Sequence, residues 1–77
     1  MTDRLWEYLV NEFETTNKDY IEIKTDQDDR FVVEPIYNCD HSEIVDFAVF
    51  HGSYFTNVRE EPDIWFWEEI EKSININ

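Results

Sequence analysis

The sequence predicts a small α+β domain with an N-terminal helix, an antiparallel sheet of three or four strands and a C-terminal helix. Apolar residues recur at helical spacing near both ends of the chain, and the segments between them have the apolar patterning of strands. Short polar clusters separate these segments. Because nothing in the 77 residues marks a linker, residues 1–77 are expected to form one acidic domain.

The first predicted helix begins at Thr2 or Asp3, either of which can cap it, and runs to about Thr15. Its apolar stripe consists of Leu5, Trp6, Leu9, Val10 and Phe13. The polar cluster at residues 15–19 interrupts this spacing, so the helix is expected to end there.

Two strands are predicted next. Residues 20–24 alternate with period two, and residues 26–29 form a polar turn before a second strand at residues 30–34. Proline has no N–H for a sheet ladder, so Pro35 indicates that this second strand ends near a sheet edge or a bulge.

The strongest strand candidate is residues 43–51, which follow a polar break at residues 38–42. Alternation along this strand predicts that Val45, Phe47 and Val49 face the core.

A turn at residues 52–53 leads to a short fourth strand at residues 54–59. Residues 60–63 then combine three acids with one proline, which suits the first turn of a helix. This second helix is expected to run to about Ser73.

The second helix contains three adjacent aromatic residues, Trp65, Phe66 and Trp67. Successive helical residues are about 100° apart, so the three rings cannot all face one core. The predicted buried stripe is Phe66, Trp67 and Ile70, which leaves Trp65 outside it. Two interpretations of Trp65 stay open: it packs against the first helix or residues 54–59, or it is an exposed anchor for a partner.

Charge gives the main functional indication. The chain has 19 acids and six Lys or Arg residues, for a net charge of −13. A small domain needs a net charge of only about 2–8 in magnitude for solubility, so the excess favours a basic partner and argues against direct nucleic-acid binding. The predicted partner-binding residues are Asp26, Asp28, Asp29, Glu60, Glu61, Asp63, Trp65, Glu68, Glu69 and Glu71. A solvated helix surface is the alternative interpretation of the helical acids.

No catalytic residue, metal ligand or cofactor is predicted, so the protein is not expected to be an enzyme. Cys39 with His41 and His51 lacks the paired spacing of structural zinc ligands, and no pocket is evident for a cysteine nucleophile. The acidic turn begins like a calcium loop, but Phe31 stands where the loop needs glycine and Tyr37 where it needs glutamate.

In size, acidity and lack of catalytic motifs, the chain resembles phage-encoded inhibitors of bacterial defence or DNA metabolism: anti-CRISPR proteins, anti-restriction DNA mimics and uracil-DNA glycosylase inhibitors. The resemblance covers the composition of the whole chain and transfers no residue roles. It implies stoichiometric binding to a basic nucleic-acid-binding protein or ribonucleoprotein complex, with nucleic-acid mimicry as one mode.

A cytoplasmic location, that of the host cell for a phage protein, is expected because there is one cysteine and no apolar segment long enough for a membrane. Two alternatives are an immunity protein or antitoxin against a basic nuclease toxin, and an acidic interaction domain that does not inhibit. The oligomeric state, including a homodimer, is also open.

Overall fold

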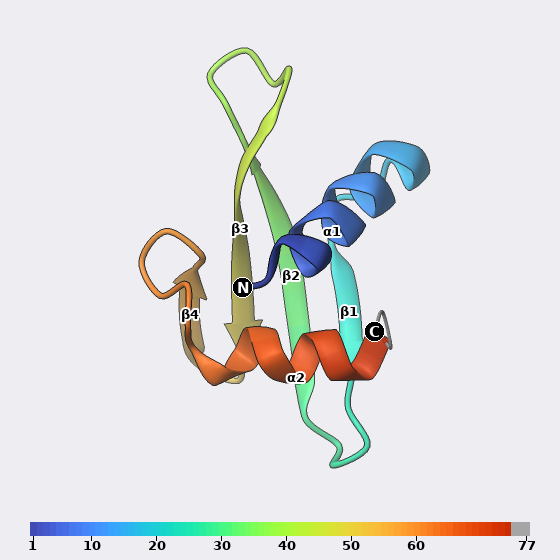
Figure 1. The fold of residues 1–77 in the computed structure, drawn as a ribbon, viewed down its shortest axis with the longest axis vertical. Helices are drawn as coiled ribbons and strands as arrows, with labels where there is room; N and C mark the ends of the chain where they lie inside the picture. The colour runs from blue at the N-terminus through green and yellow to red at the C-terminus, as the bar shows by residue number, and fades with distance from the viewer. Residues whose placement is uncertain (75–77) are drawn as a thin grey trace.

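The computed structural model describes residues 1–74. Its elements are α1 (Asp3–Thr16), β1 (Ile21–Lys24), β2 (Arg30–Tyr37), β3 (Ile44–His51), β4 (Tyr54–Asn57) and α2 (Trp65–Ile74) (Figure 1). The four strands form one antiparallel sheet in the order β1-β2-β3-β4, so each strand pairs with its neighbour in the chain. Both helices cross the same face of the sheet (Figure 1). The α+β prediction is confirmed.

The start of α1 follows the sequence prediction. Thr2 is the N-cap residue, and its Oγ1 accepts a hydrogen bond from the backbone N–H of Leu5 at 3.1 Å. At the other end, Asn17 adopts a left-handed conformation with φ 56°, and its N–H donates to the Phe13 carbonyl at 3.1 Å. The helix is therefore closed at both ends by its own sequence.

The core lies between the two helices and the face of the sheet that they cover. It contains the predicted stripe of α2 (Phe66, Trp67 and Ile70) and the predicted inward residues Phe47 and Val49. The other members of this cluster are Leu5, Leu9, Phe13, Ile23, Phe31, Val33 and Ile44. Each large apolar side chain buried in this way contributes about 1.5–3 kcal/mol, which is how so short a chain holds two helices on its sheet.

The predicted end of the second strand is wrong, because β2 continues through Pro35 to Tyr37. The β1–β2 pairing stops at Ile21 and Val33, so Pro35 lies where β2 has no partner on the β1 side. The missing N–H of Pro35 therefore interrupts no β1–β2 ladder. A register shift between Ile36 and Tyr37 follows, so the expectation of a nearby edge or bulge is confirmed.

The prediction that Val45 faces the core is also wrong. Ile36 pairs with Asp46 and Tyr37 pairs with Ile44, which leaves Val45 as the extra residue of a β-bulge. The extra residue shifts the alternation by one position. Ile44 is consequently buried at 8% exposure, whereas Val45 is 39% exposed.

The second helix begins later than predicted, at Trp65 rather than within residues 60–63. The backbone N–H of Glu61 donates to the Asn57 carbonyl at 3.0 Å, and that of Ile64 donates to the Glu61 carbonyl at 3.4 Å. These bonds form turns between β4 and α2. The acids expected in the first helical turn therefore lie in the connecting segment instead.

Candidate functional site

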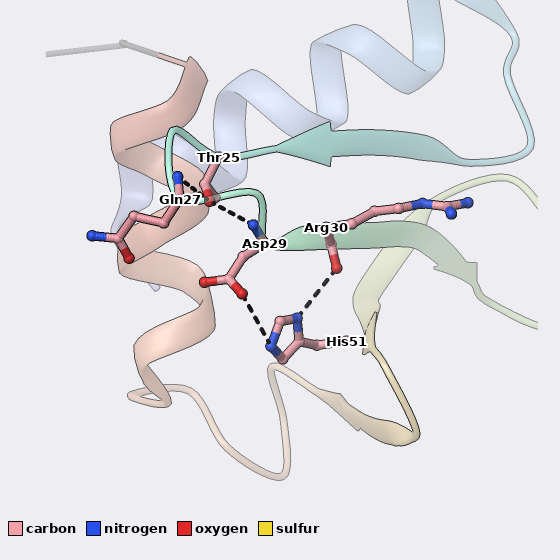
Figure 2. A network of polar contacts seen from close by, with 5 residues as sticks. All are labelled: Thr25, Gln27, Asp29, Arg30 and His51. Atoms are coloured by element: carbon pink, nitrogen blue, oxygen red, sulfur yellow. Dashed lines mark hydrogen bonds and ion pairs between the residues drawn. The ribbon is translucent and has the colours of Figure 1, made fainter.

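The turn between β1 and β2 is built around Thr25, which is 8% exposed. Its Oγ1 accepts hydrogen bonds from the backbone N–H groups of Asp29 at 3.1 Å and Gln27 at 3.3 Å (Figure 2). The Thr25 N–H donates to the Asp29 carbonyl at 2.8 Å, and Asp28 takes a left-handed conformation with φ 64°. The turn thus has a defined conformation in which Asp26 and Asp28 are exposed.

His51, at the end of β3, connects this turn to the sheet. Its Nδ1–H donates to the Arg30 carbonyl at 3.2 Å, because a carbonyl oxygen can only accept. Its Nε2 lies 4.0 Å from an oxygen of Asp29, so protonation of the ring creates an ion pair (Figure 2). The ring also stacks on Phe31 with centroids 4.5 Å apart. Asp29 is therefore held toward β3.

Trp65 lies outside the buried stripe of α2, as predicted, and is 50% exposed. Its ring makes edge contacts with Phe66, His51 and Phe31, at centroid distances of 4.8, 5.6 and 6.0 Å. It therefore packs on the start of β2 and the end of β3, whereas the first interpretation places it against the first helix or residues 54–59. The indole thus contacts three rings while about half of the residue's surface stays exposed to solvent.

Glu69 lies on the side of α2 that faces the β1–β2 turn. It lines a hollow with Asp26 and Gln27, and its carboxylate is 3.8 Å from the ammonium of Lys72. The fold thus gathers five of the ten predicted residues from two distant parts of the chain. We call them the acidic surface: Asp26, Asp28, Asp29, Trp65 and Glu69.

Two other predicted residues, Glu68 and Glu71, lie on the opposite flank of α2, and a third, Asp63, lies in the segment just before it. Asp63, Glu68 and Glu71 line a hollow beside the first residues of the chain, Met1 and Thr2. The hydroxyl of Thr2 donates to the Glu71 carboxylate. These acids extend negative charge around α2 but do not face the β1–β2 turn.

The last two predicted residues, Glu60 and Glu61, lie between β4 and α2. Glu60 is exposed, but the Glu61 carboxylate turns toward β4 and accepts hydrogen bonds from Thr56 Oγ1 at 2.9 Å and from the Tyr54 hydroxyl. The bond from Tyr54 raises the pKa of that phenol. The Glu61 carbonyl accepts from the indole N–H of Trp67 at 3.2 Å. Glu61 thus connects β4 to α2 within the fold.

The β2–β3 hairpin tip carries Cys39 and His41, while His51 lies at the other end of β3. Within residues 1–74, no three His, Cys, Asp or Glu side chains gather as metal ligands do. At the tip, Ser42 donates hydrogen bonds to Asp40 from its hydroxyl at 2.7 Å and its N–H at 3.1 Å. These bonds lower the pKa of the Asp40 carboxyl.

The contacts of His51 with Arg30, Asp29 and Trp65 were not predicted, because this residue was considered only as a metal ligand or a base. The sequence held one signal for these contacts. His51 ends the strongest strand candidate, and in an antiparallel pair the end of one strand lies beside the start of the other.

A second set of apolar residues in β3 was also missed. Ala48 and Phe50 alternate with the core-facing Phe47 and Val49, which indicates two apolar faces.

Comparison of the chain with protein-family models, with curated proteins and with solved structures found no match. None of the helices in residues 1–74 has the length and apolar character needed to cross a bilayer. The geometry and charge of the chain itself are therefore the only guides to its function.

Proposed function

We propose that the protein is a small acidic inhibitor that binds stoichiometrically to a basic nucleic-acid-binding protein or ribonucleoprotein complex. The observation that carries the proposal is the position of Trp65, half exposed and held by rings of β2, β3 and α2 beside carboxylates from two elements. Trp65 and Asp29 both contact His51, so the aromatic face and the charged turn have a fixed relation.

Fixed carboxylates can occupy a cleft that binds phosphates. DNA carries one negative charge per about 1.7 Å of its axis, and a cleft that binds it is lined with Lys and Arg. Of the charged groups in this chain, 19 are acidic and six are basic, so most carboxylates have no cation of their own to neutralise them. The exposed face of Trp65 adds an aromatic surface of the kind that bases offer to such a cleft. Inhibition on this mechanism needs occupancy and no chemical step.

The partner is to be captured from a bacterial lysate on the immobilised protein, identified by mass spectrometry, purified and titrated. We expect a basic nucleic-acid-binding protein whose Kd rises at least about tenfold between about 50 and 500 mM salt. Nucleic acid should compete with the inhibitor for it. A basic nuclease toxin as the partner would instead indicate an immunity protein or antitoxin.

Two variants of equal charge change test the surface itself. Asp26→Lys with Glu69→Lys reverses two charges of the acidic surface, and Glu7→Lys with Glu14→Lys reverses two exposed charges of α1. The first pair should weaken binding by about tenfold or more, and the second pair by much less, because local complementarity adds to the overall attraction. A Kd that is independent of salt, or equal losses in both pairs, would contradict the proposed surface.

A further inference from the structure

The face of the sheet opposite the helices has no part in the proposed function. No helix of residues 1–74 covers it (Figure 1). A row of side chains crosses all four strands on this face: Glu22 pairs with Val32, Val32 with Phe50, and Phe50 with Phe55. The rings of Phe50 and Phe55 are 4.8 Å apart, and Phe55 is 55% exposed. The centre of this face is therefore an apolar row, Val32, Phe50 and Phe55, that meets solvent.

The exposed charges around the apolar row nearly balance one another. Lys24 and Arg30 form a cross-strand pair on one side of the row, and Glu34 lies on the other side. Glu22, at the end of the row, binds Arg30 with a contact of 2.8 Å. Lys24 also lies 3.5 Å from the carboxylate of Asp28, in the β1–β2 turn at the edge of this face. Two of the chain's six cations thus face three exposed acids here. Most of the net charge of −13 therefore resides on the rest of the molecule.

Asp46 also lies on this side of the sheet but presents no free carboxylate to it. It is 6% exposed, and its Oδ1 accepts hydrogen bonds from the backbone N–H groups of Phe47 at 2.7 Å and Val58 at 3.1 Å. The open face consequently offers a second acidic molecule little direct repulsion.

The strand register shows how two copies fit. Arg30, Val32 and Glu34 follow one another on this face of β2. A two-fold axis along the apolar row sets Val32 against its own counterpart and exchanges the two sides of the row. Arg30 of each copy then lies over Glu34 of the other. The usual angle of about 30° between packed sheets keeps these long side chains within reach of each other.

We propose that this face docks a second copy of the chain, forming a two-fold dimer across the apolar row with Arg30–Glu34 ion pairs at its sides. Four strands about 4.8 Å apart give a face about 19 Å wide, and the eight residues of β2 or β3 at about 3.4 Å each give a length of about 27 Å. The area of about 500 Å² is below the roughly 800 Å² per partner of a stable interface. The dimer is therefore weak and depends on concentration.

Salt distinguishes this dimer from the proposed inhibition. Each copy carries a net charge of −13, so the copies repel at long range, and salt screens that repulsion. The dimer should tighten as salt rises, whereas binding to a basic partner should weaken. Failure of one proposal therefore leaves the other intact.

The test is sedimentation equilibrium at protein concentrations of about 10 µM to 1 mM, at about 50 and 500 mM salt. Phe55→Ser, which adds no charge, should raise the dimer Kd by about tenfold, as should Arg30→Glu or Glu34→Arg alone. The double variant Arg30→Glu with Glu34→Arg should restore dimerisation, because the same ion pair forms with its signs exchanged. Lys72→Glu on α2 matches the charge change of Arg30→Glu and should leave the dimer Kd nearly unchanged.

Circular dichroism should confirm that each variant is folded, as expected for exposed positions. A monomer at every concentration and salt would overturn the inference, and so would a dimer that Phe55→Ser and the single charge changes leave intact. If the protein stays monomeric while Phe55→Ser weakens capture of the basic partner, the face belongs to that partner and the dimer is wrong.

Discussion

Replacing Trp65 and Trp67 in turn by alanine separates a contact residue from a core residue two positions away. Trp67 is 2% exposed, and its indole N–H donates to the Glu61 carbonyl at 3.2 Å. Trp67→Ala should cost about 3–5 kcal/mol of unfolding free energy. A domain of 77 residues has about 4–12 kcal/mol in total, so this variant should lose from about a quarter of its stability to all of it.

Trp65→Ala should cost much less unfolding free energy than Trp67→Ala. At 50% exposure, about half of its roughly 200 Å² of surface leaves water on folding, which at about 25 cal/mol per Å² gives an upper value of about 2.5 kcal/mol. We expect about 1–2 kcal/mol for Trp65→Ala, since alanine keeps part of that burial. The protein should therefore stay folded and lose its partner, mainly through an off-rate raised by about tenfold or more.

Urea denaturation followed by circular dichroism measures the two stabilities without relying on tryptophan fluorescence, and surface plasmon resonance measures the off-rate. If Trp65→Ala destabilises the fold as much as Trp67→Ala and the folded fraction still binds, Trp65 is a core residue. The contact surface would then have to be the four acids of the acidic surface without Trp65.

Two further predictions concern pH. The hydrogen bond to Glu61 raises the pKa of Tyr54, so this contact stabilises the fold below the ordinary tyrosine pKa and is lost as the pH rises through the raised value. In an NMR titration, Glu61→Ala should move the Tyr54 titration to lower pH, and an unchanged titration would show that the contact is absent. The bonds from Ser42 lower the pKa of Asp40, so they stabilise the hairpin tip above the ordinary aspartate pKa and are lost as the pH falls through the lowered value. Ser42→Ala should raise the Asp40 pKa in the same kind of titration, and no change would refute this assignment.

Features that depend on neighbours in sequence were predictable. Thr2 caps α1 through a bond to a residue three positions away, and the stripe of α2 follows from helical spacing. The face of the sheet on which Val45 lies was not predictable in this way. It depends on which residue of β2 lies opposite, and alternation within β3 carries no information about a bulge in the pairing.

The same distinction applies to the candidate site. The acids and Trp65 were identifiable as residue types, but the meeting of Asp29 and Trp65 at His51 requires three elements to come together. The exposure of Phe55 was equally unpredictable, because a strand with apolar residues on both faces does not show which face the helices will cover. Charge and local spacing thus predicted what the surface is made of, and the tertiary fold determined its arrangement.

The order of strands in the sheet also affects how the protein can be synthesised. Each strand pairs with the next one along the chain, so the three hairpins can form in succession as residues leave the ribosome. The hydrophobic cluster, however, joins Leu9 of α1 to Ile70 of α2, near opposite ends of the chain. Until α2 emerges, the nascent sheet exposes Phe31 and its neighbours on the face that the helix will cover. A chain truncated before α2 would therefore be prone to aggregation or proteolysis.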